Sequence, residues 1–188
     1  MAEYAAERSI GARIAAARRA RGYRSPTALA EALEGTGITT AILENIEAGR
    51  RSKLDVSIVL NIARVLGVPL SALLAPIARP DDPLDLANLG PAFDGMSAGE
   101  FDAWIGVSPN SDHLASSAAE RNDRAELRAL RELQLQRREL DRLRKADAIE
   151  DAAGRPEALA AASRSRIAGI ENDITELRKY LTSAGWEL

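Results

Sequence analysis

Apolar residues in the first 75 positions recur at intervals of three and four, the period of helices that bury one face. Gly49 and Gly67 interrupt this pattern, and glycine commonly follows the last turn of a helix. Ser25, and either Thr39 or Thr40, can act as N-caps because their hydroxyls accept hydrogen bonds from free backbone N–H groups. The pattern therefore predicts five short helices, at about residues 9–20, 25–33, 39–48, 56–66 and 69–74.

Residues 114–188 carry a longer helical pattern. From about Leu114 to Ala152 there is neither Pro nor Gly, so one helix of roughly 35–40 residues, about 55 Å long, is predicted. Gly154-Arg155-Pro156 interrupts it, and a second helix is predicted from there to about Thr182. The second helix has the alternating spacing of a coiled-coil seam, whereas Arg137 occupies a seam position of the first. We predict a helical hairpin, with a seam that also serves a dimer, made of Leu130, Leu133, Leu140, Leu143, Ile167, Ile170, Ile174, Leu177 and Leu181.

Residues 76–113 differ in composition from the segments on either side. They contain five of the eight prolines and four of the 13 glycines, which is typical of a connector. Apolar residues such as Phe101 and Trp104 are too frequent for a plain linker, and Ser97 and Glu100 have the spacing of a capping box. We expect one or two short helices here that pack on another part of the protein. Three regions follow: 1–75, the connector 76–113, and 114–188.

Composition favours helices over strands. Alanine supplies much of the 46% of apolar residues and aromatic residues are only 4%, and Ala forms helices well and strands poorly. The absence of Cys excludes disulfides and thiolate metal sites and is typical of a reducing compartment. No apolar run reaches the length of a membrane span. We expect a cytoplasmic protein with no membrane contact, no metal and no cofactor.

The formal net charge of −3 is unevenly divided along the chain. Residues 1–75 hold ten basic and seven acidic residues (+3), residues 76–113 hold one and seven (−6), and residues 114–188 hold fourteen of each (0). Only the N-terminal region has the charge sign that suits a polyphosphate.

The N-terminal region contains, in order, IGARIAAARRARG, LAEAL, ITTAILENIEAGRR and VLNIARVLGVPLSALL. This order resembles the Cro/C1-type (XRE) helix-turn-helix transcriptional regulators, phage repressors among them, over about residues 9–75. Its most distinctive part is the Ile-Glu-x-Gly-Arg that ends the third helix, followed by the Leu-Gly-Val of the fourth. The resemblance implies an all-α chain with an N-terminal five-helix lambda-repressor-like domain, to which the predicted C-terminal hairpin or coiled coil is added.

The resemblance also implies that helix 39–48 lies in the major groove of double-stranded DNA, and that the protein is associated with the nucleoid when it is bound to DNA. Asn pairs bidentately with adenine, Thr bonds to a base or touches a thymine methyl, and Glu accepts from cytosine N4. Direct readout is expected chiefly from Thr40 and Asn45, while Thr39 has the alternative role of a helix cap. The implied base-contacting set is Thr39, Thr40, Ala41, Glu44 and Asn45.

Other residues match the family's phosphate-contacting and structural positions. A helix N-terminus offers free N–H groups to an anion, and a basic loop adds salt-dependent affinity. Arg18 and Glu47 match an ion pair that fixes the angle between helices. The chain departs from the family in a longer turn between the second and third helices, in Ala48, and in lacking Pro after the basic loop. The implied phosphate contacts are Ser25, Arg50, Arg51 and Lys53.

We therefore expect a sequence-specific transcriptional regulator, a repressor, that forms a homodimer through its C-terminal helices. A phage or prophage immunity repressor and a host regulator are both open. The alternative is an antitoxin or adaptor whose C-terminal helices bind a partner protein. A further hypothesis is that the acidic connector lies against the basic DNA-binding face and competes with DNA, while a soluble tether is the simpler interpretation.

An enzyme is not expected. The single histidine, His113, stands beside Asp112 in the connector, and a lone His is more often a surface residue than a catalyst. The chain has neither a phosphate-binding GxxxxGK[ST] motif nor a GxSxG nucleophile motif.

Overall fold

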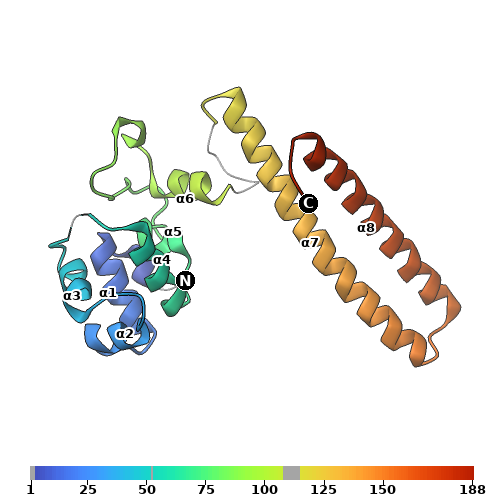
Figure 1. Ribbon diagram of the computed structural model, residues 1–188, viewed down its shortest axis with the longest axis horizontal. Helices are drawn as coiled ribbons and strands as arrows, with labels where there is room; N and C mark the ends of the chain where they lie inside the picture. Colours follow the sequence, from blue (N-terminus) through green and yellow to red (C-terminus); the bar gives the residue numbers. More distant parts are fainter. Residues whose placement is uncertain (1–2, 52, 108–114) are drawn as a thin grey trace. The chain divides into compact units, whose positions relative to one another are not determined.

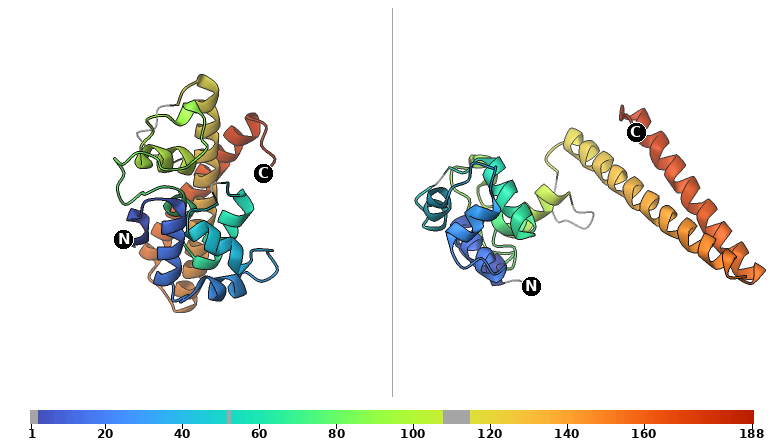
Figure 2. Two further views of the ribbon diagram at one scale, coloured as in Figure 1. Left: turned by 90° about the vertical axis from the view of Figure 1, so that its left-hand side faces the viewer. Right: turned by 60° about the horizontal axis from the view of Figure 1, so that its bottom comes forward.

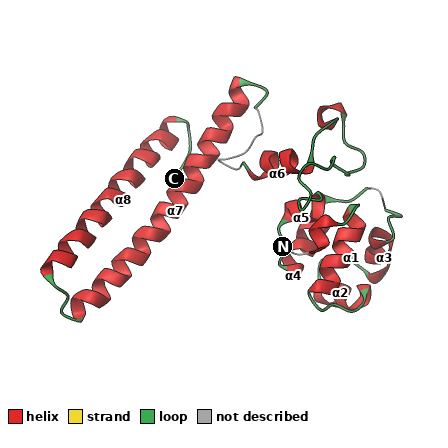
Figure 3. Cartoon of the chain, turned by 180° about the vertical axis from the view of Figure 1, so that it is seen from behind, coloured by secondary structure: helices red, strands yellow, loops and turns green. Residues whose placement is uncertain are grey.

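The computed structural model describes residues 3–51, 53–107 and 115–188, and the chain divides into two compact units, 1–113 and 114–188. Helices and loops make up the described residues, apart from one isolated bridge between Pro83 and Ser97 (Figure 3). The prediction of an all-α chain is confirmed. In the part of the chain that is described, no helix combines the length and the apolar character that crossing a membrane requires. His113 and Leu114 lie outside the described residues.

The N-terminal unit contains the five short helices that the apolar pattern predicts (Figure 1). They are α1 (Ile10–Ala20), α2 (Pro26–Ala32), α3 (Thr40–Glu47), α4 (Val56–Leu66) and α5 (Leu70–Leu74), preceded by the 3₁₀ turn η1 (Glu3–Ala6). Ser25 and Thr39 cap α2 and α3, because each hydroxyl accepts a hydrogen bond from a backbone N–H three residues later. Gly67 ends α4 in the left-handed conformation, with φ at 60°. Pro69 precedes α5 instead of forming its first position.

One face of each of these helices meets in a common core. Helix α3 packs against both α1 and α2, and α5 packs against both α1 and α4. Apart from Tyr4 of η1, the side chains buried in this core are aliphatic, as the spacing of three and four predicts. The largest fully buried apolar side chains are Ile14, Leu29, Leu33, Leu43, Ile46, Ile62 and Leu73.

The segment from residue 76 to 107 belongs to the N-terminal unit. It forms the short turn η2 (Pro91–Phe93) and helix α6 (Ala98–Gly106), which packs against α5. The predicted capping box is present, since Ser97 and Glu100 each accept a hydrogen bond from the other's backbone N–H. A second small core of Ala75, Ala98 and Phe101 attaches this segment to the five-helix unit.

The C-terminal unit is a hairpin of two long antiparallel helices, α7 (Ala118–Ala152) and α8 (Glu157–Ser183). Figures 1 and 2 show them lying side by side along their length. Ser117 caps α7 at its beginning, and the turn that joins the helices contains Gly154, whose φ is 80°. The predicted hairpin and its interruption are therefore confirmed.

The predicted seam lies between the two helices. Leu133, Leu140 and Leu181 are buried, and the other six predicted seam residues are half-buried. The sequence prediction was wrong at one position, because Arg137 is exposed and Gln136 is the half-buried residue there. The spacing of three residues from Leu133 to Gln136, followed by four to Leu140, keeps the seam facing α8.

Polar contacts bind the two helices along their length and at the turn. Arg144 pairs with Glu171 at 2.6 Å, and Arg166 pairs with Glu139 at 2.7 Å, although these pairs are exposed and stabilise little. Near the open end of the hairpin, the Trp186 indole donates a hydrogen bond of 2.8 Å to Glu126. At the turn, the nearly buried Arg155 side chain lies between three acidic groups, Asp147, Glu150 and Asp151.

Candidate nucleic-acid interface

Helix α3 presents an exposed face that is opposite to its buried one. Leu43 and Ile46 point into the core, whereas Ala41, Glu44 and Asn45 are exposed. An eight-residue helix with two buried positions leaves its other side open because each turn advances the chain by 3.6 residues. Four of the five residues expected to contact bases are exposed, and the fifth, Thr40, is half-buried.

Thr39 caps helix α3, which is the alternative role that the sequence analysis gave it. Its hydroxyl oxygen accepts a hydrogen bond of 3.3 Å from the Ile42 N–H and forms the N-cap of α3. This contact satisfies one of the free backbone donors of the first turn. Thr40 is the first residue inside the helix and is half-buried, whereas the capping Thr39 is exposed.

The basic loop is attached to the end of α3. The Asn45 carbonyl accepts hydrogen bonds from the backbone N–H groups of Arg50 at 2.9 Å and Arg51 at 3.2 Å. The Arg50 side chain also donates from Nε to Asn45 Oδ1 at 2.8 Å. One amide oxygen lone pair of Asn45 is thus engaged, and bidentate pairing with a base requires Arg50 to move or to share that oxygen.

The remaining expected phosphate contacts differ in their surroundings. Arg51 makes a weak ion pair with Asp55 at 3.4 Å and donates from Nε to the Lys53 carbonyl at 3.2 Å. Lys53 is exposed. Ser25 is half-buried at the start of α2, and its hydroxyl oxygen accepts from the Ala28 N–H at 3.1 Å. The described contacts join Arg50 and Arg51 to α3 but do not join Ser25 to this group.

The predicted pair of Arg18 and Glu47 fixes the end of α3 against α1. Arg18 donates from Nε and Nη2 to the two Glu47 oxygens at 2.7 and 2.9 Å, and from Nη1 to the Tyr23 carbonyl at 2.7 Å. Arg18 is nearly buried, and the hydrogen bond to Glu47 raises the pKa of its guanidinium. A bidentate pair of this kind orients two elements more than it stabilises them.

The backbones of α1 and α3 approach closely at Gly11. A Cβ atom at this position would lie 2.1 Å from the Ile46 carbonyl oxygen and 3.3 Å from the Glu47 Cα. Both atoms belong to the backbone and cannot be moved by a rotamer change. Gly11 therefore sets the distance between α1 and the last turn of α3, from which the basic loop begins.

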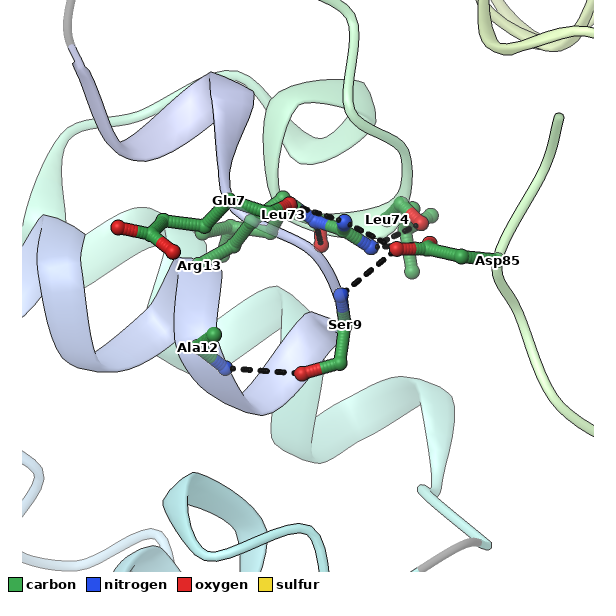
Figure 4. A network of polar contacts seen from close by, with 7 residues as sticks. All are labelled: Glu7, Ser9, Ala12, Arg13, Leu73, Leu74 and Asp85. Atoms are coloured by element: carbon green, nitrogen blue, oxygen red, sulfur yellow. Dashed lines mark hydrogen bonds and ion pairs between the residues drawn. The ribbon is translucent and has the colours of Figure 1, made fainter. Parts of the chain in front are cut away.

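Sequence reasoning missed a second buried arginine. Arg13 is fully buried in α1 and makes two hydrogen bonds of 2.7 Å with the two oxygens of Asp85 (Figure 4). Its other donors reach the carbonyls of Glu7, Leu73 and Leu74 at 2.7 to 2.9 Å. The available signal was the position of Arg13, which lies three residues after Ile10 on the apolar face of its helix.

Asp85 attaches the acidic segment to the start of α1. Besides Arg13, it accepts a hydrogen bond of 2.7 Å from the Ser9 N–H (Figure 4). Ser9 caps α1 from the left-handed region, with φ at 74°, a conformation that non-glycine residues rarely adopt. The hypothesis that the acidic connector lies against the basic face does not extend to Asp85, whose charge is already paired with Arg13.

The N-terminal unit is expected to lose stability in acid through Asp85. Burial raises the pKa of this carboxyl, but hydrogen bonds from Arg13 and the Ser9 N–H outweigh burial and hold the pKa below its ordinary value of 3.8. A carboxyl whose pKa is lower in the folded than in the unfolded state stabilises the fold when it is ionised, and this stabilisation is complete well above pH 3.8. It is lost as the pH falls toward and through the pKa of the folded state. Urea unfolding from pH 7 to 3 should therefore show a steeper loss for wild type than for Asp85→Asn.

The exposed neighbour Asp81 provides the control for this titration. Asp81→Asn should retain the wild-type acid dependence, because Asp81 does not belong to the Arg13 network. Equal acid dependence in wild type and Asp85→Asn would contradict the role assigned to Asp85.

The exposed face of α3 and the loop that follows it carry polar and cationic side chains. In the described residues no group of three or more His, Asp or Glu side chains could hold a metal ion. The exposed polar side chains of α3 and the cations that follow it are donors and acceptors suited to base edges and phosphates. No protein-family model, curated protein or solved structure matches the chain.

Proposed function

We propose that the protein is a sequence-specific double-stranded DNA-binding transcriptional regulator that acts as a repressor and reads the major groove with α3. The observation that carries the proposal is the exposed face of Ala41, Glu44 and Asn45, followed directly by the cationic loop. A small side chain permits close approach to a base pair, and Glu and Asn supply acceptor and mixed donor–acceptor groups for base edges. The loop contributes affinity that does not depend on sequence.

The packing around α3 supports the same proposal. A recognition element must be held at a fixed angle, because a small displacement misaligns its hydrogen bonds with the bases. The Arg18–Glu47 pair and the backbone approach at Gly11 both hold the last turn of α3 on α1. These contacts explain how a helix of only eight residues can keep a defined orientation.

Asn45→Ala should relax the DNA specificity of the protein at one base-pair position. The test is selection of bound duplexes from a random pool at physiological salt, with wild type and the variant side by side. The loss of one bidentate contact should reduce discrimination at that position about tenfold. Lys179→Ala, on the hairpin, is the matched control and should select the wild-type motif.

The outcomes of this selection separate the alternatives. An enriched motif that forms an inverted repeat supports a dimeric operator-binding regulator, since each protomer reads one half-site. An asymmetric motif supports DNA binding by a single copy. No enrichment by a folded protein would overturn the proposal.

We further propose that the hairpin forms a homodimer. Its exposed apolar side chains support this, because Leu135, Ile149, Leu159 and Tyr180 are 45 to 71% exposed. In a unit of only two helices these side chains lie outside the seam and six of the seam residues are only half-buried, and a second copy would cover both sets. An antitoxin or adaptor function, in which a different protein covers these side chains, is the second candidate and rests on the same exposure.

Leu135→Glu should convert the dimer to a monomer. The variant places a charge among apolar side chains that we expect to be covered, whereas Gln134→Glu adds the same charge at an exposed polar neighbour. Light scattering should give about twice the 20.2 kDa chain mass for wild type and Gln134→Glu, and one chain mass for Leu135→Glu. A monomeric wild type would contradict the dimer and favour a different partner protein.

A further inference from the structure

A cavity of about 420 Å³ lies beside the candidate DNA-binding face within the N-terminal unit. Its walls come from the first turn of α1, the end of α3 with the loop that follows, the starts of α4 and α5, and residues 85–89. Cavities of this size are in the range that small-molecule ligands occupy in proteins. The chain therefore has a candidate ligand site at the junction of the basic loop and the acidic segment.

The lining of this cavity is aliphatic. It includes Ile10, Leu54, Leu70, Leu74 and Leu86, all of them half-buried, and none of the described residues that line it is aromatic. At its edge, Val56 is 71% exposed and Leu89 is 40% exposed. An aliphatic ligand would cover these apolar groups and gain the free energy of removing them from water, which a polar, sugar-like ligand would gain to a smaller extent.

The charged groups of the cavity favour an anion. Asp85 is compensated, because Arg13 and the Ser9 N–H occupy both of its oxygens. Arg51 makes a single ion pair among the described contacts, at 3.4 Å to Asp55, whose side chain is 74% exposed, and its Nε donates a hydrogen bond of 3.2 Å to the Lys53 carbonyl. A carboxylate could replace that weak partner in a less solvated place, where the same charge pair is stronger.

We propose that this cavity binds a small aliphatic carboxylate, with its chain among the leucines and its carboxylate on Arg51, and that binding weakens the protein's affinity for DNA. The second part rests on the proposed function, since Arg51 is one of the expected phosphate contacts. One guanidinium that pairs with a ligand is no longer available to a phosphate, and the ligand also contacts the loop that carries Arg50 and Lys53.

Octanoate and octan-1-ol are the probes, because they share an aliphatic chain and differ in charge. In titrations of the ¹⁵N-labelled full chain, amide shifts should concentrate at Ile10, Leu54 and Leu86. Octanoate should bind about tenfold more tightly than octan-1-ol, because its carboxylate adds one charge-assisted hydrogen bond to Arg51. Arg51→Gln should abolish this advantage, and Arg64→Gln, an exposed arginine outside the cavity lining, should preserve it.

Each outcome decides one part of the proposal. Absent shifts, shifts confined to residues 115–188, or an octanoate advantage that survives in Arg51→Gln would overturn the site. Ala87→Trp, which fills the cavity from an exposed lining position, supplies a second test and should lose octanoate binding while Arg51 is intact.

The coupling to DNA is measured separately on a duplex from the selection. Saturating octanoate should weaken DNA binding by wild type about tenfold and should leave the Ala87→Trp affinity unchanged. Octanoate binding without an effect on DNA would overturn the coupling alone. Failure to bind any duplex in the absence of octanoate would overturn the proposed function, while the titration would still decide the site.

Discussion

Replacing Arg13 with Met is expected to lower the free energy of unfolding of the N-terminal unit by about 3–5 kcal/mol. Arg13 is fully buried, and Met preserves much of its apolar stem. The substitution leaves the carbonyls of Leu73 and Leu74 without the Arg13 donor and removes the cation that pairs with Asp85. The expected loss in the free energy of unfolding is large because buried acceptors lose their donors and a partly buried carboxylate loses its cation.

The two units each contain one of the two tryptophans, and this makes the effect of Arg13→Met measurable unit by unit. Trp104 lies in α6 and contacts Phe93 and Phe101, whereas Trp186 lies in the hairpin. In a Trp186→Phe background, fluorescence reports the N-terminal unit. In a Trp104→Phe background, it reports the hairpin.

Arg13→Met should shift only the Trp104 transition to lower urea. Arg19→Met, at an exposed position of the same helix, is the control and should change the free energy of unfolding by less than about 0.5 kcal/mol. A Trp104 transition that is equally stable in Arg13→Met would show that the network is dispensable. A shift of the Trp186 transition would show that the two units do not unfold independently.

The helices of this chain could be predicted closely because the signals that define them are local. Apolar spacing located the helices of both units, and Ser25, Ser97 and Gly67 marked ends that the structure confirms. Caps and left-handed glycines act within four residues of each helix end. The same local rules located the hairpin turn, where Gly154 ends the first long helix.

Contacts between distant residues could not be predicted in the same way. Arg13 and Asp85 are 72 residues apart, and no periodicity connects a buried helix position to one acid among seven in the acidic segment. The close approach at Gly11 likewise depends on how α1 and α3 cross, which the sequence does not state. Arg18 and Glu47 were paired in advance only because a family resemblance supplied the pairing.

The candidate site was predictable in its residues but not in its geometry. The apolar periodicity predicted Ala41, Glu44 and Asn45 on the outer face of α3, and in the structure they are exposed there. The hydrogen bond between Arg50 and Asn45 was not predictable, because it depends on how the chain turns after Gly49. This turn brings a residue expected to contact phosphate to one expected to read a base, so the two roles are coupled in the free protein.

Gly11→Ala is expected to destabilise the N-terminal unit by about 3 kcal/mol, at the upper end of the usual cost of overpacking. The added Cβ would lie 2.1 Å from the Ile46 carbonyl oxygen, so α1 and α3 must move apart. That movement lengthens the Arg18–Glu47 hydrogen bonds and tilts the face that carries Asn45. Affinity for the selected duplex should therefore fall more than the lost stability alone explains.

Gly169→Ala is the matched control and should have the opposite sign. Gly169 lies in the interior of α8, and a Cβ there meets nothing within 4 Å. Because Ala is favoured over Gly inside helices, the hairpin should gain about 0.5–1 kcal/mol in the Trp186 transition. If both glycine variants proved stabilising, α1 and α3 could separate without cost, and the approach at Gly11 would not set the position of α3. The contrast in sign therefore tests packing and helix propensity in one chain, with the same chemical change at both sites.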